Sequence, residues 1–185
     1  MIFGQHSNLK GSHAFLSPSN NSLWNATDEH LIELWRSAKA IELGTAYHAW
    51  AERTINLGIK QPRSHKTIYE YVNDAIGYGM KPEQVLYYTD NCFGTTDAIS
   101  FDNNILRIHD LKTGKSPAHM EQLIRYAALF CLEHNIKPGG IKTVLRLYQN
   151  DEIIEMQAGV EDILPVMDQM IRWNKIIDRL KDQEG

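Results

Sequence analysis

The sequence predicts an α/β (α+β) domain with one central mixed sheet flanked by helices. Apolar residues recur at three- and four-residue spacing in the N-terminal part of the chain and again at its C-terminal end, which is typical of amphipathic helices. Between them lie short extended segments, separated by turn residues and by one further periodic helix. Helices, strands, a helix, strands and a final helix are the order expected of a single covered sheet.

The sequence predicts a loop-rich N-terminal segment, residues 1–26, followed by a single domain, residues 27–185. The first segment is rich in Ser, Asn, Gly and His and predicts at most a short helix around Leu23 and Trp24. Thr27 or Asp28 can cap the first long helix. Further helices are predicted from about Gly44 to Asn56, from Ser64 to Gly77–Gly79, from Gln122 to His134 and from about Glu161 to Leu180.

Five segments have the pattern of β-strands, either because apolar and polar residues alternate or because β-branched residues are frequent. The predicted strands are Val85–Tyr88, Cys92–Phe101, Ile105–Lys112, Thr143–Gln149 and Ile153–Ala158. The first three follow one another directly and predict an antiparallel meander.

Composition restricts the class of protein. A chain of 185 residues that is 43% hydrophobic and 23% charged can bury a core. Its net charge of -4 does not indicate a nucleic-acid partner, so any DNA contact needs a local basic surface or a bound metal. Cys92 and Cys131 are too few for a disulfide scaffold and are expected to be reduced. No stretch approaches the roughly 20 apolar residues of a membrane span, so a cytoplasmic protein without a membrane partner is expected.

The turn Asn103-Asn104 carries the first functional prediction. Both residues tolerate positive φ, so a two-residue hairpin would pair Asp102 with Ile105 and, further along, Asp97 with Asp110. Like charges opposite each other are destabilising, and a divalent cation would reverse that effect. Because side chains alternate, Lys112 shares a face with Asp110.

This face predicts a metal-dependent hydrolytic site. Carboxylate oxygens suit Mg²⁺ or Mn²⁺, and a bound ion can activate water and neutralise phosphate charge. Lys112 would orient the water or stabilise developing charge. The alternative is a surface hairpin in which Asp97 and Asp110 are merely solvated; a register slip of one residue would favour it.

Four motifs in order carry a resemblance to a known family. They are Gly44-x-x-x-His48-x-x-x-Glu52, Gly94-Thr95-Thr96-Asp97, Asp110-Leu111-Lys112 and Gln122-x-x-x-Tyr126. Together they resemble the PD-(D/E)XK nuclease superfamily, in its RecB-like branch, over about Gly44 to Tyr126. Thr96 stands where the superfamily name has proline, a departure common in that branch.

The resemblance implies a role for each residue of the site. It implies that His48, Asp97, Asp110 and the backbone carbonyl of Leu111 bind Mg²⁺ or Mn²⁺. Glu52 would lie nearer the periphery, either supporting a ligand from outside or binding the metal through water. It implies that Lys112 is catalytic. Gln122 and Tyr126 would contact DNA phosphate or hold Lys112 and the water in place. Basic residues that could add a phosphate-binding surface are Arg63, His65, Lys66 and Lys115.

The implied activity is hydrolysis of DNA phosphodiesters, as a phage-type exonuclease leaving a 5′-phosphate, in recombination, repair or replication in the bacterial host cytoplasm. Two alternatives remain: a catalytically weak DNA-binding accessory protein with the same fold, and a phage protein that binds a host nuclease. The final helix, with Ile163, Met170 and Trp173, could form an interface in a homo-oligomer or with a recombination partner protein. It could equally cover its own domain.

Overall fold

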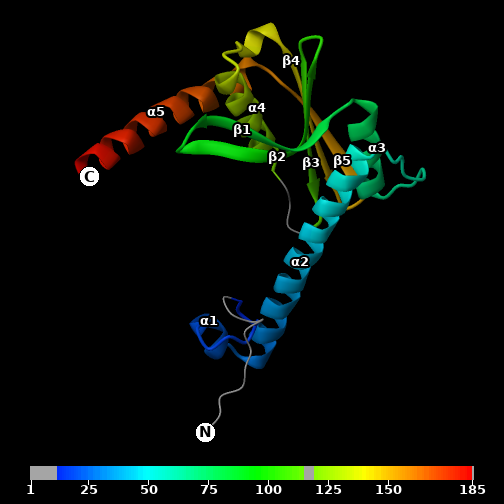
Figure 1. Cartoon of the computed structure of the whole chain (residues 1–185), viewed down its shortest axis with the longest axis vertical. Helices are drawn as coiled ribbons and strands as arrows, with labels where there is room; N and C mark the ends of the chain where they lie inside the picture. Colours follow the sequence, from blue (N-terminus) through cyan, green and yellow to red (C-terminus); the bar gives the residue numbers. More distant parts are fainter. Residues whose placement is uncertain (1–11, 115–118, 185) are drawn as a thin grey trace. The chain divides into compact units, whose positions relative to one another are not determined.

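The computed structural model describes residues 12–114 and 119–184, so Lys115 lies outside the described residues. It is an α+β fold with a five-stranded mixed sheet flanked by helices, which confirms the expected class (Figure 1). Its helices are α1 (Asn21–Trp24), α2 (Asp28–Asn56), α3 (Thr67–Gly77), α4 (Glu121–Glu133) and α5 (Val160–Glu184), with a 3₁₀ turn, η2, at Pro138–Gly140. Its strands are β1 (Lys81–Thr89), β2 (Cys92–Asp102), β3 (Ile105–Lys112), β4 (Lys142–Gln149) and β5 (Glu152–Ala158).

The strands lie side by side in their order along the chain. The pairs β1–β2, β2–β3 and β4–β5 are antiparallel, as hairpin connections allow. Strands β3 and β4 are parallel, and α4 lies in the crossover that a parallel pair requires. The sheet is therefore mixed because α4 connects β3 to β4 and makes that pair parallel.

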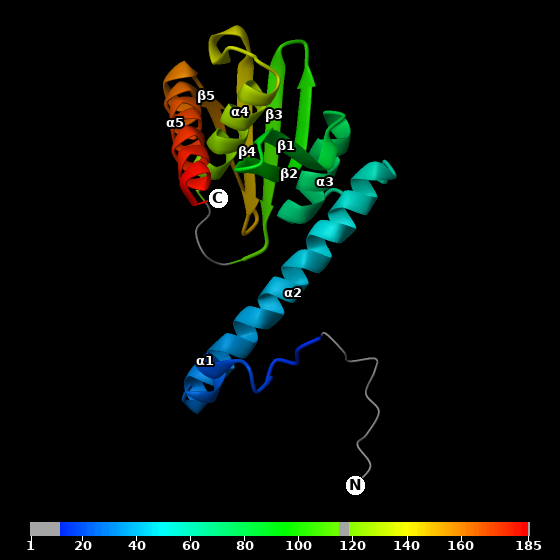
Figure 2. The same cartoon turned by 60° about the vertical axis from the view of Figure 1, so that its left-hand side comes forward.

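Each face of the sheet has its own core. Figure 2 shows α4 and α5 on one side of the sheet and α3 on the other. Buried apolar side chains on the α4 side include Leu86, Leu123 and Ile163. On the opposite side Leu111 and Tyr148 of the strands pack with Tyr71 of α3 and with the C-terminal part of α2. Burial on both faces fixes the register of the central strands, because a slip of one residue would exchange the faces.

The described chain divides into two compact units at Leu43 and Gly44, within α2. In the N-terminal unit Thr27 caps α2, since its hydroxyl accepts the backbone N–H of His30 at 3.3 Å. The rings of Phe15 and Trp35 meet edge to face, with centroids 4.9 Å apart. The sheet and the candidate site belong to the second unit.

Several boundaries differ from the sequence-based ones. The helices expected before and after residue 44 form one helix, α2. Helix α3 begins at Thr67, because Ser64 instead accepts the N–H of Lys66 in a turn. Strand β1 begins at Lys81 and contains Pro82, which an edge strand tolerates. Helix α5 continues to Glu184.

The structure also describes the two cysteines and the apolar character of the helices. Both cysteines are free, Cys131 buried and Cys92 half-buried. Among the described residues, no helix combines the length and apolar character of a membrane span.

Candidate active site

The β2–β3 hairpin has the predicted turn and register. Asn103 and Asn104 both have positive φ, and Asp102 pairs with Ile105. The ladder runs to the pair Ala98 and His109, one step before the position where Asp97 would face Asp110. The strands therefore part at the point where the two carboxylates would meet.

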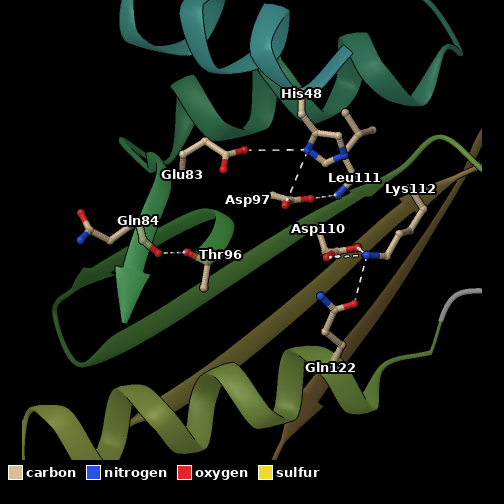
Figure 3. A network of polar contacts seen from close by, with 9 residues as sticks. All are labelled: His48, Glu83, Gln84, Thr96, Asp97, Asp110, Leu111, Lys112 and Gln122. Atoms are coloured by element: carbon tan, nitrogen blue, oxygen red, sulfur yellow. Dashed lines mark hydrogen bonds and ion pairs between the residues drawn. The ribbon is translucent and has the colours of Figure 1, made fainter. Parts of the chain in front are cut away.

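Asp97 takes the place of a ladder partner at this point. Its Oδ2 accepts the backbone N–H of Leu111 at 2.8 Å (Figure 3). This bond fixes the peptide between Asp110 and Leu111, directly before the carbonyl that the family resemblance implies as a metal ligand. Leu111 is buried among the apolar side chains near Tyr71 and Tyr148, a position that suits a backbone role rather than a side-chain one.

Asp110, Lys112 and Gln122 form a second, connected group. The ammonium of Lys112 lies 3.1 Å from Oδ1 and 3.0 Å from Oδ2 of Asp110, and it donates to Oε1 of Gln122 at 3.0 Å. Asp110 is buried, and its Oδ2 has only this ion pair, without a hydrogen bond of suitable direction within the described chain. A buried carboxylate oxygen with spare acceptor capacity is suited to a cation.

His48 brings α2 to the same site. Its Nδ1 lies 3.6 Å from Oδ1 of Asp97 and 3.9 Å from Oε1 of Glu83. Ligand atoms of His48, Glu83 and Asp97 all lie within 4.8 Å of one another, close enough to share one metal ion. One imidazole and two carboxylates suit Mn²⁺, and the carboxylates suit Mg²⁺.

Glu83 is the member of this group that the sequence did not predict. It lies in β1 with φ at 48°, a left-handed conformation that is uncommon for a residue with a side chain. Its neighbours Pro82 and Gln84 pair with Ala98 and Thr96, so Glu83 and Asp97 occupy facing positions outside the ladder. Both strands leave regular pairing where their carboxylates approach His48.

Burial and the charge of a neighbouring carboxylate raise the pKa values of Asp97 and Glu83. The pKa of Asp97 rises to about 6, first through burial and then through the charge of Asp110; His48, the Leu111 N–H and Lys112 act in the opposite sense. Burial also raises the pKa of Glu83, with a smaller contribution from Glu52 and a lowering one from His48. A divalent cation bound here would stabilise the ionised form of both carboxylates.

Glu52 lies one turn of α2 beyond His48. Its charge acts on Glu83, but among the described residues it does not join the group whose ligand atoms converge. Of these two carboxylates, Glu83 and not Glu52 joins the converging group among the described residues.

Two glycines of the motifs are explained by close packing. A Cβ at Gly94 would lie 3.1 Å from Cε1 of Tyr126, so α4 approaches β2 over a residue without a side chain. A Cβ at Gly44 would lie 2.8 Å from Oγ1 of Thr113, directly after Lys112. Tyr126 therefore packs against the β1–β2 hairpin, while Gln122, one turn earlier on α4, reaches Lys112.

The basic residues proposed for phosphate contact are mixed with acidic ones. Arg63 and His65 line a hollow together with Glu70 and Asp74. Lys66 lies over the ring of Tyr69, with Nζ 5.8 Å from the centroid. The three basic residues of this set that the structure describes are therefore interspersed with carboxylates and an aromatic ring.

The sequence was compared with protein-family models and with curated proteins. No protein-family model matches the chain, and no curated protein matches it.

Proposed function

We propose that this chain is a metal-dependent DNA nuclease of PD-(D/E)XK type. The observation that carries the proposal is the meeting of two residue groups across Leu111. His48, Glu83 and Asp97 offer converging ligand atoms on one side, and Asp110, Lys112 and Gln122 are connected on the other. The central mixed sheet flanked by helices agrees with the architecture that this family resemblance implies.

The donor set fits Mg²⁺ or Mn²⁺. Two carboxylates and one imidazole converge in the group of His48, Glu83 and Asp97, and a buried carboxylate oxygen outside that group, Oδ2 of Asp110, has spare acceptor capacity. We assign His48, Glu83, Asp97 and Asp110 as candidate ligands, together with the Leu111 carbonyl. When bound, such an ion would activate water and neutralise charge on the phosphodiester.

The ammonium group of Lys112 is suited to contact the attacking water or the phosphate oxygens. Its ammonium is held by Asp110 and Gln122, so its position is fixed before substrate arrives. From there it would hold the attacking water or stabilise the negative charge that develops on phosphate. Hydrolysis adds water across one P–O bond and leaves a phosphate on one product and a hydroxyl on the other.

The biological setting remains part of the proposal. An exonuclease that acts on DNA ends in phage recombination, repair or replication, within a bacterial host, is the setting that the resemblance implies. DNA is its proposed substrate.

The test compares cleavage of end-labelled linear duplex, linear single strand and closed circles in Mg²⁺, in Mn²⁺ and in EDTA. We expect metal-dependent loss of linear DNA by the wild type and none by Asp110→Asn or Lys112→Met. Asp102→Asn, an exposed carboxylate in the same hairpin, is the matched control and should cleave normally. Wild-type rates in either site variant would contradict the mechanism, whereas survival of the circles would identify an exonuclease.

A further inference from the structure

An exposed aromatic pair lies at the outer end of the β1–β2 hairpin. The rings of Tyr87 and Phe93 are stacked, with centroids 6.3 Å apart and planes 25° apart. The two residues are partners across the ladder, and 46% of Tyr87 and 63% of Phe93 is exposed. Large apolar rings that remain in solvent after folding often mark a binding surface.

The pair lies on the side of the hairpin that faces away from α4. Leu86 belongs to the core that α4 covers, and Gly94 faces Tyr126 of α4. Side chains alternate along a strand, so the neighbours of these two residues point to the other side. They are Val85, Tyr87, Phe93 and Thr95, all four exposed.

His48, Glu83 and Asp97 lie on this same side, whereas Asp110 is connected through Lys112 to Gln122 of α4. Figure 3 shows His48 and Gln122 on opposite sides of the strands, with Glu83 and Asp97 directed toward His48. Gln122 lies on α4, so the group around His48 faces away from α4. Glu83 and Tyr87 are four positions apart on β1, which corresponds to roughly 13 Å of strand. One exposed strip thus runs along the hairpin from the candidate ligands to the aromatic pair.

Charge on the strip decides what can occupy it. Tyr87 donates its hydroxyl to Asp90 at 2.7 Å and its backbone N–H to Glu133 at 3.0 Å, so carboxylates flank the pair. Phosphate would be repelled there, whereas the uncharged faces of nucleobases would not. Base stacking on aromatic side chains supplies affinity without regard to sequence.

We infer that Tyr87 and Phe93 form a stacking platform for unpaired bases of the strand that enters the candidate active site. This inference rests on the proposed nuclease function and specifies its substrate as single-stranded nucleic acid, or a duplex end with an unpaired strand. Paired bases within a duplex present only edges to a protein surface, so they cannot stack on the platform.

The test measures binding of a fluorescent oligothymidylate of about 16 nucleotides. Ca²⁺ replaces Mg²⁺, and the oligomer is recovered afterwards to verify that it is intact. We expect Phe93→Ala to weaken binding about tenfold, the effect of one lost stacked base. Trp173→Ala, which removes an aromatic ring of comparable exposure from α5, is the matched control and should bind as the wild type does.

Two further substitutions separate stacking from simple apolar contact. Phe93→Trp keeps a planar ring and should bind as tightly as the wild type, whereas Phe93→Leu keeps apolar surface without a ring and should bind as weakly as Phe93→Ala. The loss should be equal at low and high salt, because stacking releases no counterions. Wild-type affinity in Phe93→Leu, or a loss confined to low salt, would overturn the platform.

The experiment distinguishes failure of the platform from failure of the nuclease proposal. If the wild type cleaves DNA but Phe93→Ala binds and cleaves like the wild type, the platform is wrong and the nuclease stands. If the wild type cleaves no substrate but Phe93→Ala still loses binding, the platform stands alone. Sedimentation of the wild type and of Phe93→Ala completes the test. If the wild type is a dimer, and Phe93→Ala is a monomer that binds DNA equally well, the aromatic pair contacts a second copy of this chain. That result would overturn the inference.

Discussion

The carboxylate of Asp97 accepts the backbone N–H of Leu111 at 2.8 Å, where the β2–β3 ladder would otherwise continue. A side chain thus replaces a strand partner, and the peptide after Asp110 is held by a group that is itself a candidate metal ligand. The arrangement brings Asp97 and Asp110 close enough for the charge of one to raise the pKa of the other.

Asp97→Asn should stabilise the metal-free protein at neutral pH. The pKa of Asp97 is about 6 in the folded chain, against an ordinary value of 3.8, so ionisation of this group opposes folding. Its contribution to stability is fully favourable below the ordinary value and is lost as pH rises through about 6. The difference between the two pKa values corresponds to about 3 kcal/mol at most. Asparagine keeps an oxygen that can accept the Leu111 N–H.

Thermal unfolding in EDTA between pH 4 and pH 8 measures this effect. The melting temperature of Asp97→Asn should exceed that of the wild type at pH 8, and the difference should shrink as pH falls below about 6. A constant difference over the whole range would show that the carboxyl group does not titrate as its surroundings imply.

Glu83→Gln should weaken metal binding although Glu83 belongs to none of the sequence motifs. The carboxylate lies 3.9 Å from Nδ1 of His48 and shares a converging group with Asp97, so its loss removes one charged ligand. We expect the Mn²⁺ concentration that raises the melting temperature half-maximally to increase about tenfold or more. Glu152→Gln, an exposed carboxylate on β5, is the control and should titrate as the wild type does. An unchanged titration in Glu83→Gln would remove it from the ligand set.

Glu83 was not predicted because the first strand was expected to begin at Val85, and an irregularity in the β1–β2 pairing also conceals which residue faces Asp97. The turn at Asn103 and Asn104 is regular, so counting from it gives the correct register for β2 and β3. The β1–β2 ladder shifts between Tyr87 and Thr89, so counting back from Thr89 and Cys92 would place Gln84, not Glu83, opposite Asp97. A bulge of one residue exchanges the faces of a strand, and nothing in the local residue pattern announces it.

Other features were predictable because they depend on local pattern alone. Helix α4 and strands β3 and β4 have strong periodicity and agree with the expected ranges within a residue or two. The single helix α2 was not predicted, because Gly44 is a poor helix former in isolation and its reason for being there, contact with Thr113, is tertiary. The function of motif residues could be proposed from sequence, whereas their packing partners could not.

His109 should make stability fall in acid, the opposite direction to Asp97. This histidine is fully buried on β3, and its Nδ1 lies 3.2 Å from the hydroxyl of Tyr148. Burial lowers its pKa to about 3, with further lowering by Arg146 and Arg107. The folded state therefore keeps the neutral ring while the unfolded chain binds a proton below about 6.5. Its contribution to stability is complete above that pH and is lost as pH falls toward 3.

Denaturant unfolding between pH 7 and pH 4 checks this prediction through the slope of the unfolding free energy against pH. That slope is proportional to the number of protons taken up on unfolding. His109→Gln should take up about one proton fewer than the wild type when it unfolds near pH 5. Equal slopes for the two proteins would contradict a neutral, buried imidazole at this position.

Gly94→Ala should destabilise the fold through Tyr126 rather than through the backbone. Gly94 does not have positive φ, so alanine fits the strand, but its Cβ would lie 3.1 Å from the Tyr126 ring. Displacement of that ring from the β1–β2 hairpin should cost about 1–3 kcal/mol. Gly77→Ala, where a Cβ would meet nothing within 4 Å, is the matched control and should be neutral or slightly stabilising.

A double-mutant cycle separates this contact from other effects of the new methyl group. In a Tyr126→Ala background the ring is absent, so Gly94→Ala should then cost much less than it does in the wild type, with a coupling energy of about 1 kcal/mol or more. The same cycle followed by DNA cleavage tests the role of the tyrosine. If Gly94→Ala lowers cleavage in the wild-type background but not in Tyr126→Ala, the tyrosine acts by fixing the hairpin that carries Glu83 and Asp97. Equal unfolding costs in the two backgrounds would show that the alanine acts elsewhere.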